Sequence, residues 1–265
     1  MKNLNYYKKK AQEIAWHKKT LDVKYSFIGR VLHHPVFYKP ERNSFNYVFP
    51  KEQMAKIIQS HLKGKKVDRL LIAPCGEGDD FKYLGNFANQ VYGMDLSPAT
   101  VKKCPTAMKV KVCDVLDTKY PDETFDIIAS PLFFHHLLNV GFDPFLNEFY
   151  RIMKKGGKLV ILEPSVWYPL NIITRPIKKL FNNPFGEVED EAPFHPGLML
   201  KSLRRTGFTK IEMRAATFSH CSFYIPLARM VNFVTKPFLD FWLLKYFAWM
   251  VVYCAEKPTA HHFAN

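Results

Sequence analysis

Cys75, Gly76, Glu77 and Gly78 form the segment of this sequence best suited to holding a ligand. The segment follows the apolar run 69–73, at a point where a strand passes into a helix. Glycine lets the backbone approach a ligand closely, and the first turn of a helix presents unpaired N–H groups. A glycine turn alone is weak evidence, because nucleotide-binding domains and many purely structural turns share it.

Two carboxylates follow the turn, each at the end of a later apolar run. Asp95 lies 20 residues after Cys75 and ends the run 90–94, and Asp114 ends the run 109–113. A carboxylate at the end of the second strand can accept hydrogen bonds from both hydroxyls of a ribose. Each such charge-assisted bond contributes roughly 1.5–3 kcal/mol. The turn and its first acid therefore indicate a ligand that contains a ribose.

The residues that follow the turn argue against a dinucleotide as that ligand. A dinucleotide-binding turn carries a third glycine that seats the helix against the strand, but position 81 is Phe. Asp79 and Asp80 come directly after the turn and would repel a pyrophosphate. A ligand without phosphate tolerates both acids.

The chain that must position these residues alternates short apolar runs with helical patterns from residue 52 onward. This alternation is typical of a parallel sheet with crossover helices, and open sheets of that kind bind ligands at the carboxyl ends of their strands. The predicted strands are 69–73, 90–94, 109–113, 125–129, 158–162, 209–213 and 247–254; the predicted helices are 53–62, 145–153 and 197–205; a helix stop is predicted at Lys154, Lys155, Gly156 and Gly157.

Two aromatic-rich stretches interrupt the alternation after the fifth and sixth strands. Residues 164–196 are rich in Pro, Asn and aromatic residues, and residues 222–246 are strongly apolar with a helical pattern. We therefore expect a basic helical extension over residues 1–50 and one domain over 51–265 that contains both insertions. The insertions either form a helical lid over the substrate or bury their apolar side chains against the sheet.

Five segments resemble, in order and spacing, the motifs of the class I S-adenosylmethionine (SAM)-dependent methyltransferases. The resemblance is greatest to the small-molecule branch with the ubiquinone/menaquinone-type motifs, and it covers about residues 50–213 and the closing strand. It implies SAM as cofactor and an α/β, Rossmann-like fold, with helices on both faces of a seven-stranded, mostly parallel sheet and an antiparallel closing strand. The segments are LLIAPCGEG (70–78), VYGMDLSP (91–98), VCDV (112–115), YPDETFD (120–126) and RIMKKGGKL (151–159).

The same resemblance implies a role for each residue of the cofactor site. Backbone of the glycine turn would cradle the methionine part of SAM, and strand-end acids would bind the ribose and the adenine amino group. The residues concerned are Pro74, Cys75, Gly76, Glu77 and Gly78 around the methionine part, Asp95 at the ribose with Leu96 on the adenine, Asp114 at the amino group with Val115 beside it, and Ser130, Pro131 and Leu132 along the methyl-transfer face.

Two positions depart from the pattern of the family. Ile72 stands where the family has an acid in the first strand, and Pro74 stands where it has its first glycine. The missing carboxylate removes an acceptor for the backbone of the turn, and Pro74 fixes φ near −65° and removes a donor. Gly76 and Gly78 are intact, so we expect a variant site with altered SAM affinity.

Transfer of a methyl group to an oxygen needs a base that removes the proton of the acceptor, and histidine suits this task near neutral pH. His135 and His136 follow the fourth strand, on the side where the methyl group is expected. A role in helix packing or in lining the substrate stays open for both. Glu163 at the end of the fifth strand and His195 in the insertion are the alternatives.

The balance of charge favours anionic partners. The 265 residues include 38 Lys and Arg against 24 Asp and Glu, a net charge of +14, and the first 30 residues are basic with interleaved aromatic side chains. Such a segment either lies on an anionic membrane surface or packs on the domain by its aromatic face. Nucleic acid is not the expected partner, because no appended RNA-binding module is present.

The cysteines and the apolar segments bear on localisation. The five cysteines are odd in number and show no metal-ligand spacing, so reduced thiols and no metal are expected. We see no signal peptide, and charged residues interrupt the most apolar region, 223–254. A cytoplasmic protein, at most peripheral to the membrane, is therefore predicted.

The predicted function is O-methylation of a small acceptor that is hydrophobic, amphiphilic, or linked to a lipid or sugar. The aromatic-rich insertions favour such an acceptor. Two alternatives remain: a SAM-binding protein of this fold that has lost catalysis, which Ile72 and Pro74 would explain, and a nucleic-acid methyltransferase, which the charge would explain.

Overall fold

The computed structural model describes residues 6–7, 10–11, 40–171 and 192–259. Most of the predicted N-terminal extension and much of the insertion 164–196 lie outside these residues. The elements are α3 (Pro40–Leu62), β1 (Val67–Ile72), α4 (Phe81–Leu84), η1 (Gly85–Phe87), β2 (Ala88–Asp95), α5 (Pro98–Val101), β3 (Met108–Val112), β4 (Phe125–Pro131), η2 (Phe134–His136), α6 (Asp143–Ile152), β5 (Met153–Pro164), α8 (Pro196–Arg205), β6 (Thr209–Thr217), α9 (Ile225–Thr235), η3 (Lys236–Phe238), η4 (Leu244–Phe247) and β7 (Met250–Glu256).

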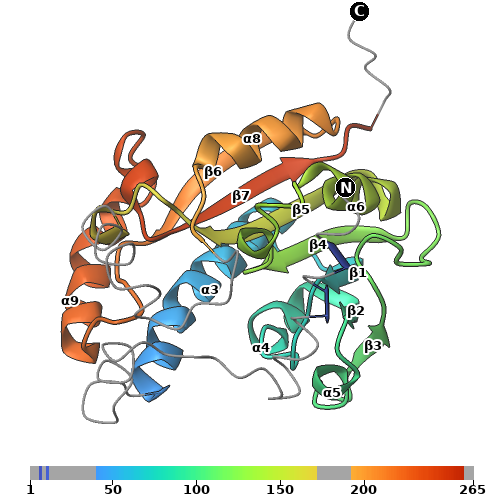
Figure 1. Ribbon diagram of the computed structural model, residues 1–265, viewed down its shortest axis with the longest axis horizontal. Helices are drawn as coiled ribbons and strands as arrows, with labels where there is room; N and C mark the ends of the chain where they lie inside the picture. Colours follow the sequence, from blue (N-terminus) through green and yellow to red (C-terminus); the bar gives the residue numbers. More distant parts are fainter. Residues whose placement is uncertain (1–5, 8–9, 12–39, 172–191, 260–265) are drawn as a thin grey trace, which may run out of the picture.

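Seven strands form one mixed sheet in the order β3-β2-β1-β4-β5-β7-β6 (Figure 1). β7 runs antiparallel to both β5 and β6, and the other neighbouring pairs are parallel. This arrangement confirms the predicted fold class. The carboxyl ends of β1, β2, β4 and β5 therefore meet at one edge of the sheet, where ligands bind in open α/β folds.

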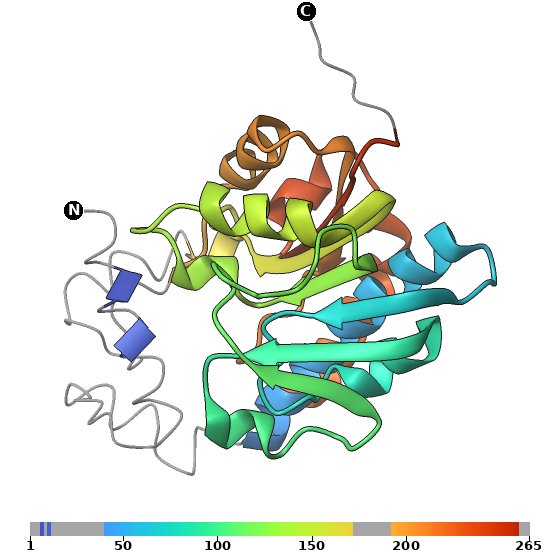
Figure 2. The ribbon, with the colours of Figure 1, turned by 90° about the vertical axis from the view of Figure 1, so that its right-hand side faces the viewer.

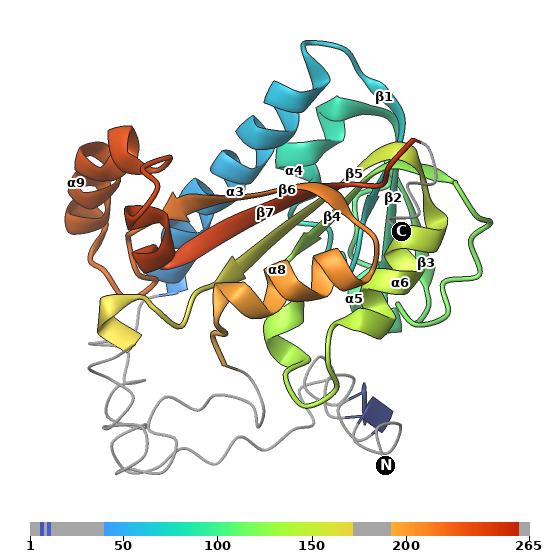
Figure 3. The same cartoon turned by 90° about the horizontal axis from the view of Figure 1, so that it is seen from above.

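Helices cover both faces of the sheet, with α3 and α4 on one face and α6 and α8 on the other (Figure 3). Successive residues of a strand point to opposite faces. In β1, Leu71 therefore belongs to the core cluster that contains Phe145 of α6, whereas Leu70 and Ile72 belong to the cluster that contains Met54 of α3. Burial on both faces explains why the strands are continuous apolar runs.

The helix ends where the stop at Lys154, Lys155, Gly156 and Gly157 was predicted, and these four residues themselves belong to β5. Helix α6 ends at Ile152, and the strand begins at the next residue. The Gly156 N–H donates to the carbonyl of Lys257 at 2.7 Å. A Cβ at Gly157 would lie 2.8 Å from the Lys154 carbonyl oxygen and 3.0 Å from that of Asp126. The glycines therefore serve close packing within the sheet.

Helix α3 begins at Pro40, well before the predicted start at residue 53, and it continues through Pro50. Tertiary contacts hold its first half in place. Asn46 is buried, donates to the carbonyls of Cys221 at 3.2 Å and Phe223 at 3.0 Å, and accepts from Ser219 at 3.0 Å. These partners lie more than 170 residues away along the chain, so local sequence signals do not reveal them.

The helix predicted over 145–153 runs over 143–152, and the apolar stretch 222–246 contains α9, η3 and most of η4, in agreement with its helical pattern. Within the described ranges, none of the helices combines the length and the apolar character needed to cross a membrane.

Candidate functional site

The glycine turn and Asp95 are in direct contact. The Cys75 N–H donates to the carbonyl of Met94 at 2.8 Å, which ties the turn to β2. The buried Asp95 carboxylate accepts the Gly76 N–H on Oδ2 at 2.9 Å. Its Oδ1 accepts the Ser97 N–H at 2.9 Å and the Thr100 hydroxyl at 3.2 Å. Asp95 therefore holds the turn and the start of α5 together, and a carboxylate has lone pairs left for a further donor.

Both glycines of the turn have backbone conformations that favour glycine, with φ +51° at Gly76 and +82° at Gly78. Their surroundings differ. A Cβ at Gly76 would meet no atom within 4 Å, so the space beside it is open. A Cβ at Gly78 would lie 2.5 Å from Cδ of Pro105. The first glycine therefore leaves room for a ligand, and the second permits close packing of the turn on the chain after α5.

We expect Gly78→Ala to lower the free energy of unfolding by about 2–5 kcal/mol. Alanine would have to adopt a left-handed backbone conformation, and its Cβ would also clash with Pro105. Gly64→Ala is the matched control, because Gly64 has φ +80° and no atom within 4 Å of an added Cβ. Its cost is the backbone term alone, about 1–2 kcal/mol. Urea unfolding measures both, and equal losses in the two variants would contradict the packing role of Gly78.

Asp114 lies just beyond the end of β3 and is bound by the N-terminal part of the chain. The Tyr6 hydroxyl donates to Oδ1, and the Lys10 ammonium lies 2.9 Å from Oδ2. The Leu116 N–H also donates to Oδ1, at 2.9 Å. Burial by itself would raise the pKa of the Asp114 carboxyl, but these hydrogen bonds outweigh it and hold the pKa below its ordinary value.

Tyr6 is buried as well as hydrogen-bonded. Its ring packs edge-to-face on Phe145 of α6 with centroids 5.6 Å apart, and its exposed fraction is 8%. Burial, followed by the contact with Asp114, raises the pKa of the Tyr6 hydroxyl, so it remains a donor. Figure 2 shows the described N-terminal residues, in blue, beyond the ends toward which the arrows of β1 to β4 point.

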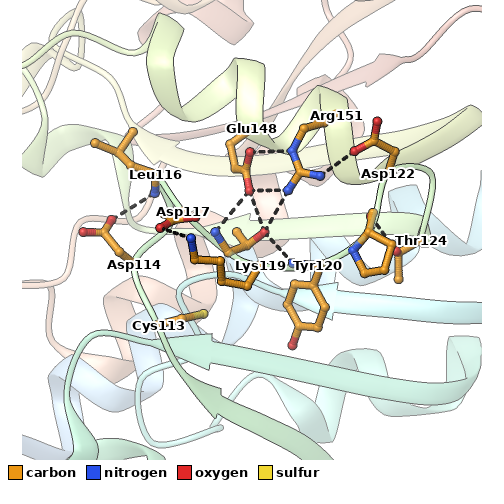
Figure 4. A network of polar contacts seen from close by, with 12 residues as sticks. Cys113, Asp114, Leu116, Asp117, Lys119, Tyr120, Asp122, Thr124, Glu148 and Arg151 are labelled. Carbon is orange, nitrogen blue, oxygen red and sulfur yellow. Dashed lines mark hydrogen bonds and ion pairs between the residues drawn. The ribbon is translucent and has the colours of Figure 1, made fainter.

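A polar network fixes the loop that carries Asp114 (Figure 4). Glu148 of α6 accepts the Thr118 N–H at 3.1 Å and the Thr118 hydroxyl at 2.6 Å. Arg151 donates to both oxygens of Glu148, at 2.8 and 2.7 Å, and also reaches Asp122. Burial opposes ionisation of Glu148, but the bonds from Arg151 and Thr118 lower its pKa overall. The loop after β3 is thus anchored to a helix rather than free.

His135 and Glu163 form a pair at the carboxyl ends of β4 and β5. Nδ1 of His135 lies 2.8 Å from Oε2 of Glu163, which is fully buried. The same carboxylate accepts the N–H groups of Phe133 at 2.7 Å, Phe134 at 2.6 Å and His135 at 3.3 Å. Because Glu163 offers only acceptors when ionised, it holds a proton on Nδ1 and leaves Nε2 of His135 to accept one.

His136 and His195, the other histidines predicted as candidates for a base, make contacts of their own. The ring of His136 stacks obliquely on that of His135, with centroids 4.1 Å apart. His195 is the N-cap of α8, where its Nδ1 accepts the Gly197 N–H at 2.9 Å, and its ring contacts Trp167. Glu163 and His135 were alternatives in the sequence, and the structure joins them in one unit.

The remaining predicted site residues surround the glycine turn and the ends of β2 and β4. Ser130 and Pro131 are buried at the end of β4, and Leu132 follows with φ +56°. The Ser130 hydroxyl is buried and has no hydrogen-bond partner within the described part of the chain. Cys75 and Val115 are buried, Pro74 and Leu96 are partly buried, and Glu77 is exposed with an ion pair to Lys103 at 2.5 Å.

Sequence reasoning missed Tyr6 and Lys10 as residues of this site. The alternation of lysines and aromatic residues near the N-terminus was the only available signal, and it does not say which strand end they reach. No group of His, Cys, Asp and Glu side chains suited to a metal ion occurs within the described ranges.

Comparisons with known proteins find similarity to methyltransferases. A family model described as a methyltransferase domain matches residues 71–161. The chain is 26% identical over 163 residues to an uncharacterised methyltransferase of Geobacillus kaustophilus, covering 60% of this chain and 70% of that protein. It is 27% identical over 190 residues to a demethylmenaquinone methyltransferase of a Geobacillus species, covering 62% and 79%. It is 33% identical over 110 residues to phosphoethanolamine N-methyltransferase 3 of Arabidopsis thaliana, covering 37% and 21%.

Solved structures with the same fold include two methyltransferases. A possible histamine N-methyltransferase from Thermotoga maritima superposes with a TM-score of 0.59 at 16% identity, over 82% of this chain and 92% of that one. A phosphoethanolamine N-methyltransferase of Haemonchus contortus, in complex with S-adenosylhomocysteine, gives a TM-score of 0.51 at 18% identity, over 78% and 52%. At these identities the likeness concerns the fold.

Proposed function

The chain is an enzyme of the SAM-dependent methyltransferase type with SAM as its cofactor, and we propose that it methylates an oxygen of a small hydrophobic or lipid- or sugar-linked acceptor. The single observation that carries the proposal is the His135–Glu163 pair at the carboxyl ends of β4 and β5. The pair provides a base oriented by a buried carboxylate, which an acceptor hydroxyl requires.

The residues of the strand edge fit the parts of SAM. Open space beside Gly76 leaves room for the methionine part, and the buried hydroxyl of Ser130 offers a polar partner. Asp95 would hold the ribose, because its carboxylate lies against the turn. Leu96 and Val115 would pack on the adenine, and Asp114 would accept its amino group. When bound, SAM supplies a methyl group activated by a sulfonium.

The chain's own residues would position the acceptor and move its proton. The proton on Nδ1 of His135 stays on the side of Glu163, so Nε2 accepts the proton of the acceptor hydroxyl. Glu163 stabilises the resulting imidazolium by charge and fixes the orientation of the ring through Oε2. Positioning of the hydroxyl for direct displacement supplies a large part of the rate, because bound reactants no longer lose entropy in the reaction.

The proposed class of acceptor is supported by the apolar composition of residues 222–246 and by the name of one relative. The demethylmenaquinone methyltransferase is named for a quinone-type acceptor, and the apolar segment 222–246 lies beside the end of β5. Two relatives are named instead for phosphoethanolamine, and one, 31% identical over 168 residues, for 25S rRNA. An amine or RNA acceptor is therefore the competing outcome of the test.

Isothermal titration with SAM followed by transfer of a labelled methyl group tests the proposal. The panel contains a prenylated phenol, a lipid-linked sugar, phosphoethanolamine and rRNA. Transfer to the hydroxyl of the phenol or sugar is expected. Transfer only to phosphoethanolamine or rRNA would overturn the class of acceptor, and SAM binding without transfer to any of the four would overturn the enzymatic proposal for this acceptor set.

Tyr6 and Lys10 are proposed to close the adenine end of the cofactor site through Asp114. We expect Tyr6→Phe and Lys10→Met each to raise the dissociation rate of S-adenosylhomocysteine by up to about fivefold, because each removes one hydrogen bond, worth about 1 kcal/mol, that holds Asp114 in position for the adenine amino group. Stopped-flow displacement measures the rate. Lys109→Met is the control, because the Lys109 ammonium binds Gln90 at an exposed place on the sheet. Tighter cofactor binding in either variant would show that the N-terminal residues compete with the cofactor.

The predicted association of the basic N-terminus with an anionic membrane remains a prediction. Residues 12–39, which carry much of its charge, lie outside the described part of the chain.

A further inference from the structure

The exposed apolar side chains of the protein are concentrated in one segment. Of the 16 large apolar side chains that are exposed within the described ranges, 12 lie in residues 224–247, which comprise α9, η3, η4 and their connections. Phe233 is 82% exposed, Trp242 67%, Tyr224 66% and Met230 57%. We call these exposed side chains of residues 224–247 the apolar patch. Such a concentration on a protein surface marks an interaction site.

One side of this segment is buried against the domain, while the other side is exposed. Ala228 and Asn232 are the buried residues of α9. Asn232 accepts the hydroxyl of Thr217 at the end of β6, at 2.7 Å. The carbonyl of Tyr246 accepts the hydroxyl of Ser165 just beyond β5, at 3.3 Å. One side of the segment therefore packs on the domain, and the other presents apolar groups on a fixed scaffold.

The apolar patch lies on the carboxyl-end side of the sheet. Figures 1 and 3 show α9 beyond the ends of β5 and β6, at one end of the molecule. Phe247 packs on Trp167, whose ring also contacts His195. Glu163 precedes Ser165 by two residues, so the patch adjoins the edge that carries the His135–Glu163 pair.

The charges among these side chains favour an anionic partner. Arg229, Lys236 and Lys245 accompany a single acid, Asp240, in residues 224–247. Asp240 lies 3.8 Å from Arg214, so another cation neutralises it in part. Aromatic and aliphatic side chains mixed with Lys and Arg are what an interfacial segment presents to headgroups and acyl chains.

We propose that the apolar patch docks this protein on an anionic lipid bilayer. The exposed aromatic and aliphatic groups of α9, η3 and η4 enter the headgroup region, and Arg229, Lys236 and Lys245 contact the anionic headgroups. The docking involves described residues other than the basic N-terminus, and it does not depend on which acceptor the enzyme methylates.

Co-sedimentation of the full chain with vesicles tests the docking surface. Vesicles of phosphatidylcholine alone are compared with vesicles of equal parts phosphatidylcholine and phosphatidylglycerol. The wild type is expected to bind the mixed vesicles more tightly. Phe233→Ser with Trp242→Ser lowers binding at least about tenfold because it removes two of the most exposed apolar groups. Lys236→Glu with Lys245→Glu lowers the preference for the anionic vesicles.

A matched control carries the same number of apolar-to-serine changes elsewhere. Val112 on β3 and Leu198 on α8 are exposed large apolar residues outside the patch, and Val112→Ser with Leu198→Ser should bind vesicles as the wild type does. Unfolding midpoints and SAM affinity, measured for every variant, separate a folding defect from a docking defect. A blue shift of tryptophan emission on vesicle binding, lost in Trp242→Phe, reports insertion of this side chain directly.

Three results would overturn the proposal. The wild type could fail to bind either vesicle, or the Phe233/Trp242 variant could bind as tightly as the control. The third is concentration-dependent self-association of the wild type that the Phe233/Trp242 variant abolishes, without vesicle binding, which would assign the patch to a second copy of the chain.

Discussion

Replacing His135 by Asn is expected to lower kcat about 10²- to 10⁴-fold, the usual contribution of a positioned general base, while SAM affinity changes little. In the proposed scheme, the imidazole is the group of the His135–Glu163 pair that takes the proton of the acceptor, and Asn cannot accept a proton near neutral pH. Single-turnover methyl transfer at saturating SAM measures the chemical step, and isothermal titration measures SAM affinity.

His195→Asn is the matched control for this substitution. His195 caps α8 through Nδ1, and Asn is also a good N-cap residue, so its kcat should stay near that of the wild type. A kcat of His135→Asn within about threefold of the wild type would remove His135 from the proton-transfer step. In that event, Nε2 would have no part in the reaction and the pair would be structural.

Glu163 is a positioning residue in this scheme, because it acts through His135. Glu163→Gln places an amide where four N–H groups now point, so we expect both a lower kcat and a lower unfolding midpoint. The variant with both changes, His135→Asn and Glu163→Gln, separates the two effects. If Glu163 acts through His135, the second substitution adds little further loss in kcat, because groups that work as a unit are not additive.

Replacing Asp95 by Asn is expected to weaken SAM binding about 10- to 100-fold, because the charged acceptor for the ribose hydroxyls is lost and each such bond is worth roughly 1.5–3 kcal/mol. The substitution also turns an amide toward the N–H groups of Gly76 and Ser97. A donor left unsatisfied in the interior costs about 1–3 kcal/mol, so the free energy of unfolding falls as well. Titration calorimetry and urea unfolding measure the two effects separately.

Asp68→Asn makes the same chemical change near the opposite end of β1, where Asp68 is exposed and lies 3.5 Å from the neighbouring Arg69. Neither SAM affinity nor stability should change appreciably there. Loss of stability in Asp95→Asn with unchanged SAM affinity would show that Asp95 only braces the turn, and the ribose would then have to be held elsewhere.

Much of the sheet edge at which the carboxyl ends of β1, β2, β4 and β5 meet can be predicted from the sequence alone. The runs around Leu71, Val91 and Ile128 are apolar because both faces of the sheet are covered, and such runs can be recognised without knowing their partners. Gly76 and Asp95 are recognisable because a turn that must approach a ligand and a strand-end acid are local features with a set spacing. The fold class follows from these local patterns, and the resemblance of the five motifs to a known family implied the SAM cofactor and the methyltransferase activity.

Other features depended on contacts between distant parts of the chain. Glu163 and His135 are 28 residues apart, and Tyr6 and Asp114 are 108 apart. In the sequence, Glu163 and His135 were competing candidates for the base. Tyr6 belonged to an N-terminal extension whose contacts with the domain were not predicted. No local signal states which strand ends become neighbours, because that depends on the order of strands in the sheet.

Exposure was likewise decided by the tertiary structure. A helix rich in Phe, Val and Leu predicts burial or a lid, yet α9 buries only one side, and Phe233 faces outward. Lys154 to Gly157 follow the end of a helix but already belong to β5, because Gly156 donates to Lys257 just after β7 and Gly157 lies close to Asp126 of β4. Local sequence thus predicted which residues lie at the carboxyl ends of the strands, whereas packing determined which of their side chains meet there and which side chains remain on the surface.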